Sequence, residues 1–193
     1  MKDTALAVFV KNPEKAKSRL AQSLGKKQAE TFYRLSLECL KEDLKDLPWN
    51  TFICPADQEP WIHTEFSGYE ILHQGEGSLG DRIQAVCHQL LQLGYRFVLV
   101  IGSDAPTLPV EYLRQCHALL LFHDCVLGPS EDGGFYLIGT QKELPELSSI
   151  PWSSPDTLKE TLKTLEIGHL TSGLGPEWFD IDTQTDLKKL KIE

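Results

Sequence analysis

The stretch Tyr95-Arg96-Phe97-Val98-Leu99-Val100-Ile101-Gly102-Ser103-Asp104-Ala105-Pro106 decides the fold class. Residues 95–101 form the strongest predicted strand of the chain. They are apolar on both faces, as a central parallel strand buried between two layers of helices requires. The strand leads directly to Asp104, a carboxylate at its carboxyl end. Ligands of open α/β sheets bind just beyond these ends, so Asp104 is the first candidate for a functional residue.

Strand and helix patterns alternate on both sides of this stretch. Further strands are expected at 4–10, 51–54, 69–73, 125–127 and 135–138, and helices at 28–47, 81–93, 109–121, 155–167 and 183–190. No repeat and no linker rich in Pro, Gly or Ser divides the chain. This order predicts an α/β fold, a three-layer α/β/α sandwich around a mainly parallel, mixed sheet, in a single domain over residues 1–193.

Composition excludes several classes of protein. A hydrophobic fraction of 41% and a charged fraction of 24% are typical of globular chains and exclude general disorder. The longest apolar runs are too short to span a membrane, and no secretory leader precedes the first predicted strand. A net charge of −9 argues against nucleic acid as a partner. Five scattered cysteines without a C-x-x-C pair predict reduced thiols and a cytoplasmic protein.

Four cations follow the first predicted strand within nine residues: Lys11, Lys15, Lys17 and Arg19. One interpretation is a loop in which Lys17 and Arg19 offset the charge of a phosphate near a helix start. The alternative is an ordinary solvated charge run. The loop is not a P-loop, because it has no glycines that would let the backbone wrap a phosphate.

A second loop, Gly75-Glu76-Gly77-Ser78-Leu79-Gly80, matches the pattern G-x-G-x-x-G. The pattern allows a Rossmann dinucleotide site, and hence an NAD(P)-dependent oxidoreductase. Two features argue against it: Glu76 would place a carboxylate beside a pyrophosphate, and the motif follows the third strand rather than the first. A loop that closes over a nucleotide is preferred, with a plain turn as the alternative.

The acidic residues at strand ends indicate metal or proton-transfer chemistry. Asp104 is well placed to hold Mg²⁺ or Mn²⁺, which take one or two carboxylates together with substrate phosphates. Glu131 or Asp132, beside Gly133 and Gly134, could supply a base or a second metal contact, although Asp-Gly is also a strong hairpin signal. Asp182 or Thr183 is interpreted as a cap of the last helix. The tryptophans, Trp152 among them, are interpreted as core or rim residues.

Several segments together resemble one family in order and spacing. They are residues 17–21, 74–82, 102–106, 127–139, 150–153 and 180–183. By these motifs the chain resembles the DUF2064 proteins, also called radical-SAM/selenodomain-associated transferase 1. The resemblance implies a GT-A-like nucleotide-diphospho-sugar transferase fold. The chain departs from the family pattern at Pro13-Glu14-Lys15-Ala16, where the family usually has Pro-Gly. Residues 16–21 resemble the phospholactate guanylyltransferases equally well.

The resemblance also implies a function and a set of site residues. The expected activity is that of a metal-dependent transferase with a nucleotide-activated donor and a small-molecule acceptor, first of all a nucleotide-sugar glycosyltransferase. The alternatives are a nucleotidyltransferase and a catalytically silent nucleotide-binding protein. Asp104 and Asp132 would be the catalytic and metal-binding residues, and Mg²⁺ or Mn²⁺ the cofactor. Nucleotide and phosphate would contact Lys11, Lys17, Arg19, Gln74, Gly75, Gly77, Gly80 and Arg82, and the acceptor would face Glu131, Gly133 and Gly134.

Overall fold

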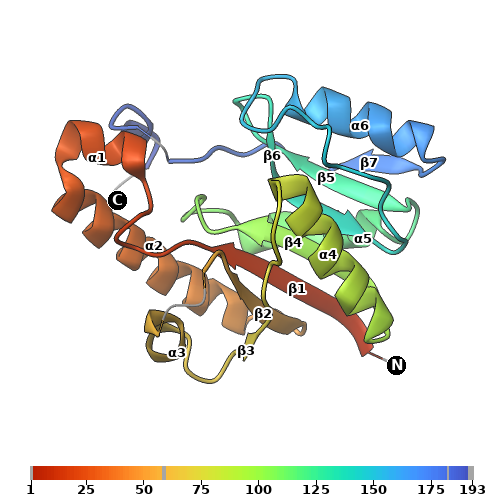
Figure 1. Ribbon diagram of the computed structural model, residues 1–193, viewed down its shortest axis with the longest axis horizontal. Helices are drawn as coiled ribbons and strands as arrows, with labels where there is room; N and C mark the ends of the chain where they lie inside the picture. The colour runs from red at the N-terminus through yellow and green to blue at the C-terminus, as the bar shows by residue number, and fades with distance from the viewer. Residues whose placement is uncertain (1, 58–59, 182, 191–193) are drawn as a thin grey trace.

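The computed structural model describes residues 2–57, 60–181 and 183–190. These residues form a seven-stranded sheet in the order β3-β2-β1-β4-β6-β5-β7 (Figure 1). Strand β6 is antiparallel to both of its neighbours, and the other pairs are parallel. The strands are β1 (Lys2–Val10), β2 (Asn50–Pro55), β3 (Glu70–Ile71), β4 (Tyr95–Gly102), β5 (Cys125–Pro129), β6 (Phe135–Thr140) and β7 (Ser172–Leu174). The predicted mixed, mainly parallel sheet is confirmed. Strands β5 and β6 pair in antiparallel fashion because the turn 130–134 between them is too short for a parallel crossover.

Helices cover both faces of this sheet. Apolar residues of α2 and α5 pack on one face, and those of α4 and α6 pack on the other, so the predicted three layers are confirmed. No helix in the described part of the chain is long and apolar enough to cross a membrane. The helices are α1 (Ser18–Leu24), α2 (Lys26–Lys45), α3 (Trp61–Glu65), α4 (Leu79–Gln92), α5 (Val110–Leu119), α6 (Thr157–Ile167) and the 3₁₀ turn η1 (Asp186–Lys189).

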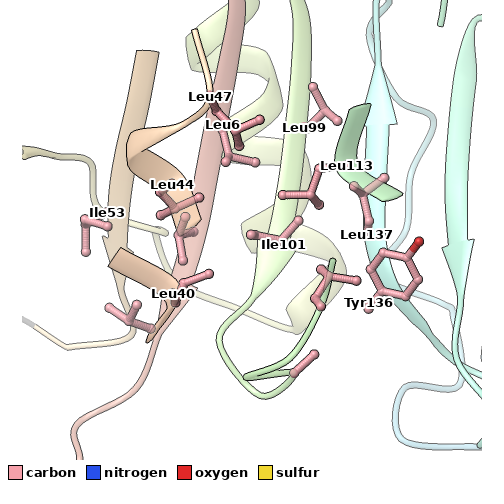
Figure 2. Packing of buried hydrophobic residues seen from close by; sticks show 14 of the residues in the cluster. Leu6, Leu40, Leu44, Leu47, Ile53, Leu99, Ile101, Leu113, Tyr136 and Leu137 are labelled. Carbon is pink, nitrogen blue, oxygen red and sulfur yellow. The ribbon is translucent and has the colours of Figure 1, made fainter. Parts of the chain in front are cut away.

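The alternation of side chains along β1 and β4 divides the core into two clusters. Leu6 of β1 and Leu99 of β4 face α2 and α5. Figure 2 shows Leu6 on the side of Leu44 of α2, and Leu99 on the side of Leu113 of α5. Their chain neighbours, such as Ala5, join the cluster under α4 and α6. Burial on both faces makes β1 and β4 rigid, and both strands end at the edge of the sheet where the acidic and basic loops begin.

Four elements differ from the prediction. Helices α1 and α3 and strand β7 were not expected, because five- and seven-residue helices and a three-residue strand have too few residues for a visible period. The helix expected over 183–190 is wrong: Thr183 and Asp186 do exchange capping hydrogen bonds, but only the single turn η1 follows. Asp182, the other predicted cap, lies outside the described residues.

Gly80 illustrates how closely α4 packs. A Cβ at this position would lie 2.3 Å from the carbonyl oxygen of Leu147. A glycine-to-alanine change in a helix normally stabilises by about 1 kcal/mol. At Gly80 the contact with a backbone oxygen reverses the sign, and we expect Gly80→Ala to cost about 1–3 kcal/mol in urea unfolding. The exposed Gln89→Ala change in the same helix should stay within about 0.5 kcal/mol. A stabilised Gly80→Ala protein would contradict this packing.

Candidate active site

A cavity of about 530 Å³ opens at the carboxyl ends of β1, β2 and β4. The β5–β6 turn and the segment before α6 close its other side. This is the edge of the sheet that the sequence predicted as the ligand site. The charged and polar side chains that line the cavity are Lys11, Arg19, Gln74, Arg82, Asp104, Ser130, Asp132, Ser153, Ser154, Thr157 and Asp180.

Asp104 lies between two lysines. The Nζ of Lys11 is 2.7 Å from Oδ2 of Asp104, and the Nζ of Lys17 is 3.0 Å from Oδ1. Burial of the carboxyl group opposes its ionisation, but the two ammonium groups outweigh this effect and lower the pKa of Asp104 to about 2. The side chain keeps 23% exposure and lines the cavity. Asp104 is therefore an ionised carboxylate at neutral pH that a ligand can reach.

The two lysines differ in what a ligand can reach. The Lys11 side chain is 57% exposed, whereas that of Lys17 is 1% exposed. The Nζ of Lys17 also donates to the main-chain oxygen of Asp104 at 3.1 Å. Its backbone is left-handed, with φ 54° and ψ 42°, which costs an L-residue roughly 1–2 kcal/mol. The structure thus places Lys17 beneath Asp104 instead of in the cavity wall, where the sequence predicted a phosphate contact. Lys11 and Arg19 do line the cavity.

A buried hydroxyl pair ties the ends of β1 and β4 together. The Tyr33 hydroxyl, on α2, accepts a hydrogen bond from the backbone N–H of Lys11 at 3.0 Å and lies 2.6 Å from the hydroxyl of Ser103. Burial, together with the nearby charge of Asp104, raises the pKa of Tyr33 to about 12, so the phenol stays neutral. This contact fixes Lys11 and Asp104 relative to each other.

Tyr33→Phe should therefore destabilise the fold. The change leaves the backbone N–H of Lys11 without its phenol acceptor and removes a buried partner of Ser103, for an expected cost of about 1–3 kcal/mol. Tyr69→Phe is a matched control, because its hydroxyl makes only a 3.4 Å hydrogen bond from a half-buried position. Urea unfolding of both variants should give a clearly larger loss for Tyr33→Phe. Equal losses of unfolding free energy would mean that the buried hydroxyl pair stabilises the fold no more than the weak hydrogen bond of Tyr69 does.

The glycine loop lies at one side of the cavity. Gln74 is buried, donates to the main-chain oxygen of Cys54 at 2.7 Å and lines the cavity. Gly75 and Gly77 have φ values of 81° and 93°, which allow the chain to turn sharply into α4. Arg82 lines the cavity, and its Nε donates to the main-chain oxygen of Gly77 at 3.2 Å. Gly80, in contrast, is not part of the cavity wall, because it packs against the backbone of Leu147.

The β5–β6 turn holds Asp132 at the opposite side. Its Oδ1 accepts hydrogen bonds from the hydroxyl of Ser130 at 2.5 Å and from the backbone N–H of Gly134 at 3.0 Å. Gly133 has φ 86°, and a Cβ there would lie 2.2 Å from the main-chain oxygen of Pro155. The hairpin interpretation of Asp-Gly is thus confirmed, and Asp132 also lines the cavity.

Glu131 lies apart from this group. Its carboxylate is exposed and pairs with the Nζ of Lys189 in η1, and its side chain is not part of the cavity wall. The sequence grouped Glu131 with Asp132 because they are neighbours in the chain. Adjacent residues of a turn point in different directions, so only Asp132 reaches the cavity.

Trp152 and Asp180 are among the residues of the cavity wall that the predicted site does not contain. Trp152 was interpreted as a core or rim residue, yet it lines the cavity and packs edge-to-face on Phe135, with ring centroids 5.9 Å apart. The sequence predicts no role for Asp180, yet this residue also lines the cavity. It lies beside Ile181, whose N–H donates to the main-chain oxygen of Asp104 at 3.3 Å. Both residues belong to segments that match the family motifs, 150–153 and 180–183, and this match is the signal in the sequence that could have pointed to them.

The carboxylates suit a cation that is shared with a ligand. Asp104, Asp132 and Asp180 line one cavity. Across residues 2–57, 60–181 and 183–190, however, no three Asp, Glu, His or Cys side chains gather closely enough to form a ready-made metal site. Mg²⁺ needs only one or two protein carboxylates when substrate phosphates supply other ligands. The donor set therefore fits a divalent cation that binds together with a phosphorylated ligand.

A family model matches residues 40–154, which is more than half of the chain. The family is DUF2064, described as an uncharacterized protein conserved in bacteria. The matched part contains the glycine loop, Asp104 and the β5–β6 turn. No protein with a curated function matches the sequence.

Solved structures share the fold over nearly the whole chain. A protein from Desulfovibrio desulfuricans G20, provisionally named a nucleotide-diphospho-sugar transferase, is 27% identical with a TM-score of 0.89, and the match covers 100% of this chain and 87% of that one. The CMP:2-keto-3-deoxy-manno-octonic acid synthetase in complex with CTP is 12% identical, with a TM-score of 0.60 and coverages of 97% and 96%. The Rv0371C protein of Mycobacterium tuberculosis H37Rv, in complex with manganese, is 12% identical, with a TM-score of 0.58 and coverages of 98% and 98%. The predicted nucleotide-diphospho-sugar transferase fold is confirmed.

Proposed function

This chain belongs to the DUF2064 family, and from that premise we propose that it transfers a glycosyl group from a nucleotide sugar to a small-molecule acceptor. The observation that carries the proposal is the arrangement of charge in the cavity. The ionised Asp104 lies beside Lys11, and Arg19 lines the same wall. Carboxylate and cations together suit a metal–diphosphate group. The similar protein from Desulfovibrio desulfuricans, provisionally named a nucleotide-diphospho-sugar transferase, supports the same donor.

In this proposal the cationic side chains bind the donor. Lys11 and Arg19 would offset the negative charge that develops on the leaving diphosphate, which is the main electrostatic contribution to such a transfer. Gln74 and Arg82, on the side of the glycine loop, would contact the nucleoside. Lys17 would act through Asp104, as a positioning residue, because its ammonium group is buried beneath that carboxylate.

A divalent cation is part of the proposal. Asp104 would hold Mg²⁺ or Mn²⁺, with Asp180 as a second candidate ligand. Asp132, which the sequence also predicted as a metal ligand, would instead face the acceptor. When bound, the cation would supply Lewis-acid stabilisation of the diphosphate charge. Asp104 is suited to this role because it stays ionised at neutral pH. The manganese complex of Rv0371C, which shares the fold, is consistent with such a site.

Thermal shifts against a panel of nucleotide sugars, nucleoside triphosphates and NAD(P)H, with and without Mn²⁺, test the donor. A ligand at one hundred times its Kd stabilises the native state by about 2.7 kcal/mol, so a true donor should raise the Tm by several degrees. We expect this shift from a nucleotide sugar, and a larger shift with Mn²⁺. Stabilisation by NAD(P)H alone would overturn the proposal in favour of an oxidoreductase.

Nucleotidyl transfer is the second candidate, favoured by the CTP complex of the 2-keto-3-deoxy-manno-octonic acid synthetase. In that reaction an acceptor attacks the α-phosphate of a nucleoside triphosphate, and pyrophosphate leaves. Glycosyl transfer instead releases a nucleoside diphosphate. Product analysis by ³¹P NMR separates the two: release of pyrophosphate would replace the glycosyltransferase proposal with this one.

A further inference from the structure

The order of the strands gives the cavity two chemically different halves. Strands β1, β2 and β3 lie on one side of β4, and β6 and β5 lie on the other. The cations of the cavity wall are Lys11, Arg19 and Arg82, and all come from segments that follow β1 or β3. This side, the cationic half, is the one assigned above to the donor.

The other side, the aromatic half, consists of the β5–β6 turn and the segment before α6. Its main surface is the edge-to-face pair of Phe135 and Trp152. Among the described residues that line the cavity, this half contributes the carboxylate of Asp132 and no lysine or arginine. Lys189 binds Glu131 and lies over the ring of Phe179, outside the cavity wall. The aromatic half therefore combines an aromatic surface with hydroxyl groups and one negative charge; its hydroxyl groups belong to Ser130, Ser153, Ser154 and Thr157.

Hydrogen bonds fix the shape of the aromatic half before any ligand binds. The N–H of Leu158 donates to the main-chain oxygen of Gly133 at 2.9 Å, which joins the turn to α6. The hydroxyl of Thr157 donates to the main-chain oxygen of Pro151 at 2.7 Å, which holds the segment that carries Trp152. The hydrogen bonds to Asp132 from Ser130 and Gly134 both reach Oδ1, so Oδ2 remains as the acceptor for a ligand.

From this chemistry, and resting on the donor assignment of the proposed function, we infer that the acceptor is uncharged or cationic, carries hydroxyl groups and has an apolar ring face. The C–H face of such a ring packs on Trp152, and one hydroxyl donates to Asp132. A phosphorylated or carboxylated acceptor should bind more weakly, because it would bring a second negative charge next to Asp132, and no lysine or arginine of this half lines the cavity to offset it.

The chemistry of transfer agrees with this arrangement. The acceptor hydroxyl oxygen forms the new bond to the anomeric carbon. The bond from that carbon to the diphosphate breaks, and its electron pair leaves with the nucleoside diphosphate. The hydroxyl proton goes to the carboxylate of Asp132, which returns it to water after release of product. Asp132 thereby serves both as the group that selects a hydroxyl and as the general base.

Saturation-transfer difference NMR on the full chain tests the inference without any nucleotide. The probes are methyl β-D-glucopyranoside, glucosamine and glucose 6-phosphate, which share a ring and differ in charge. We expect saturation on the ring protons of the first two to be at least threefold stronger than on glucose 6-phosphate. Asp132→Asn should raise the signal of glucose 6-phosphate at least twofold, because it removes the repelling charge.

Matched tryptophan variants locate the binding. Trp152→Ala should reduce the signal of methyl β-D-glucopyranoside at least fivefold, and the milder Trp152→Phe should reduce it about twofold. Trp61→Phe, outside the cavity wall, should not change it. Equal or stronger saturation of glucose 6-phosphate, no saturation of the uncharged probe, or full signal in both Trp152 variants would overturn the inference. Because no nucleotide is used, a failed donor panel and a failed acceptor surface give separate results.

Discussion

Asp104→Asn is expected to lower turnover of the nucleotide-activated donor by about 10³-fold, which corresponds to roughly 4 kcal/mol of lost transition-state stabilisation. Asparagine keeps the shape of the side chain and removes its charge. Asp104 is the carboxylate that the protein keeps ionised by two adjacent ammonium groups, with a pKa of about 2. A neutral amide can neither hold a divalent cation as firmly nor keep Lys11 in its place. Initial rates at saturating donor and metal measure the effect.

Asp124→Asn is the matched control for this variant. Asp124 also pairs with a lysine, Lys142, at 2.7 Å, and hydrogen bonds from Lys142 and Thr171 also lower its pKa to about 2. It precedes β5, at the end of the sheet opposite to the cavity. Its turnover should stay within about twofold of the wild type. The prediction is contradicted if Asp104→Asn has a native circular dichroism spectrum and the same turnover as this control. Asp104 would then have no role in catalysis.

The sequence predicted Asp104 correctly as a cavity residue because two independent patterns meet there. A doubly apolar strand must lie in the centre of a sheet, and a carboxylate directly after it must lie at the sheet edge. The layers followed from the same reasoning, since each long helix has one apolar stripe to bury. Short elements such as β7 could not be predicted in this way, because three residues are too few to show a hydrophobic period.

Which other residues line the cavity depends on the direction in which each side chain points. Neither composition nor hydrophobic periodicity predicts that direction. A charge run indicates cations after β1, but not that Lys17 adopts a left-handed backbone and directs its ammonium group under Asp104. Trp152 and Asp180 come from irregular segments, which carry no periodic signal of the face they present. Tertiary hydrogen bonds position such segments. The hydroxyl of Thr157, for example, donates to the main-chain oxygen of Pro151, next to Trp152.

Lys17→Met is expected to destabilise the protein by about 3 kcal/mol at neutral pH. The change removes one partner of a buried ion pair and leaves the Asp104 carboxylate with less of its charge offset. Lys11→Met removes the other partner, but its side chain is 57% exposed, so the loss should stay below about 1 kcal/mol. Combining Lys17→Met with Asp104→Asn should cost clearly less than the sum of the single changes, because the carboxylate that needs Lys17 is then absent. Strict additivity in urea unfolding would show that the two groups do not interact.

The pH dependence of the same variant gives a second, independent check. The pKa of Asp104 lies below its usual value of 3.8, so the ionised form stabilises the native state above about pH 4, and this contribution disappears as the pH falls through 2. A shift from 3.8 to about 2 corresponds to about 2 kcal/mol. Without Lys17 the pKa of Asp104 should rise, so the variant has less of this contribution to lose. The difference in unfolding free energy between wild type and Lys17→Met should therefore shrink from about 3 kcal/mol at pH 6 to about 1 kcal/mol near pH 2. A difference that stays constant with pH would mean that Lys17 stabilises the fold by packing its side chain and not by its charge.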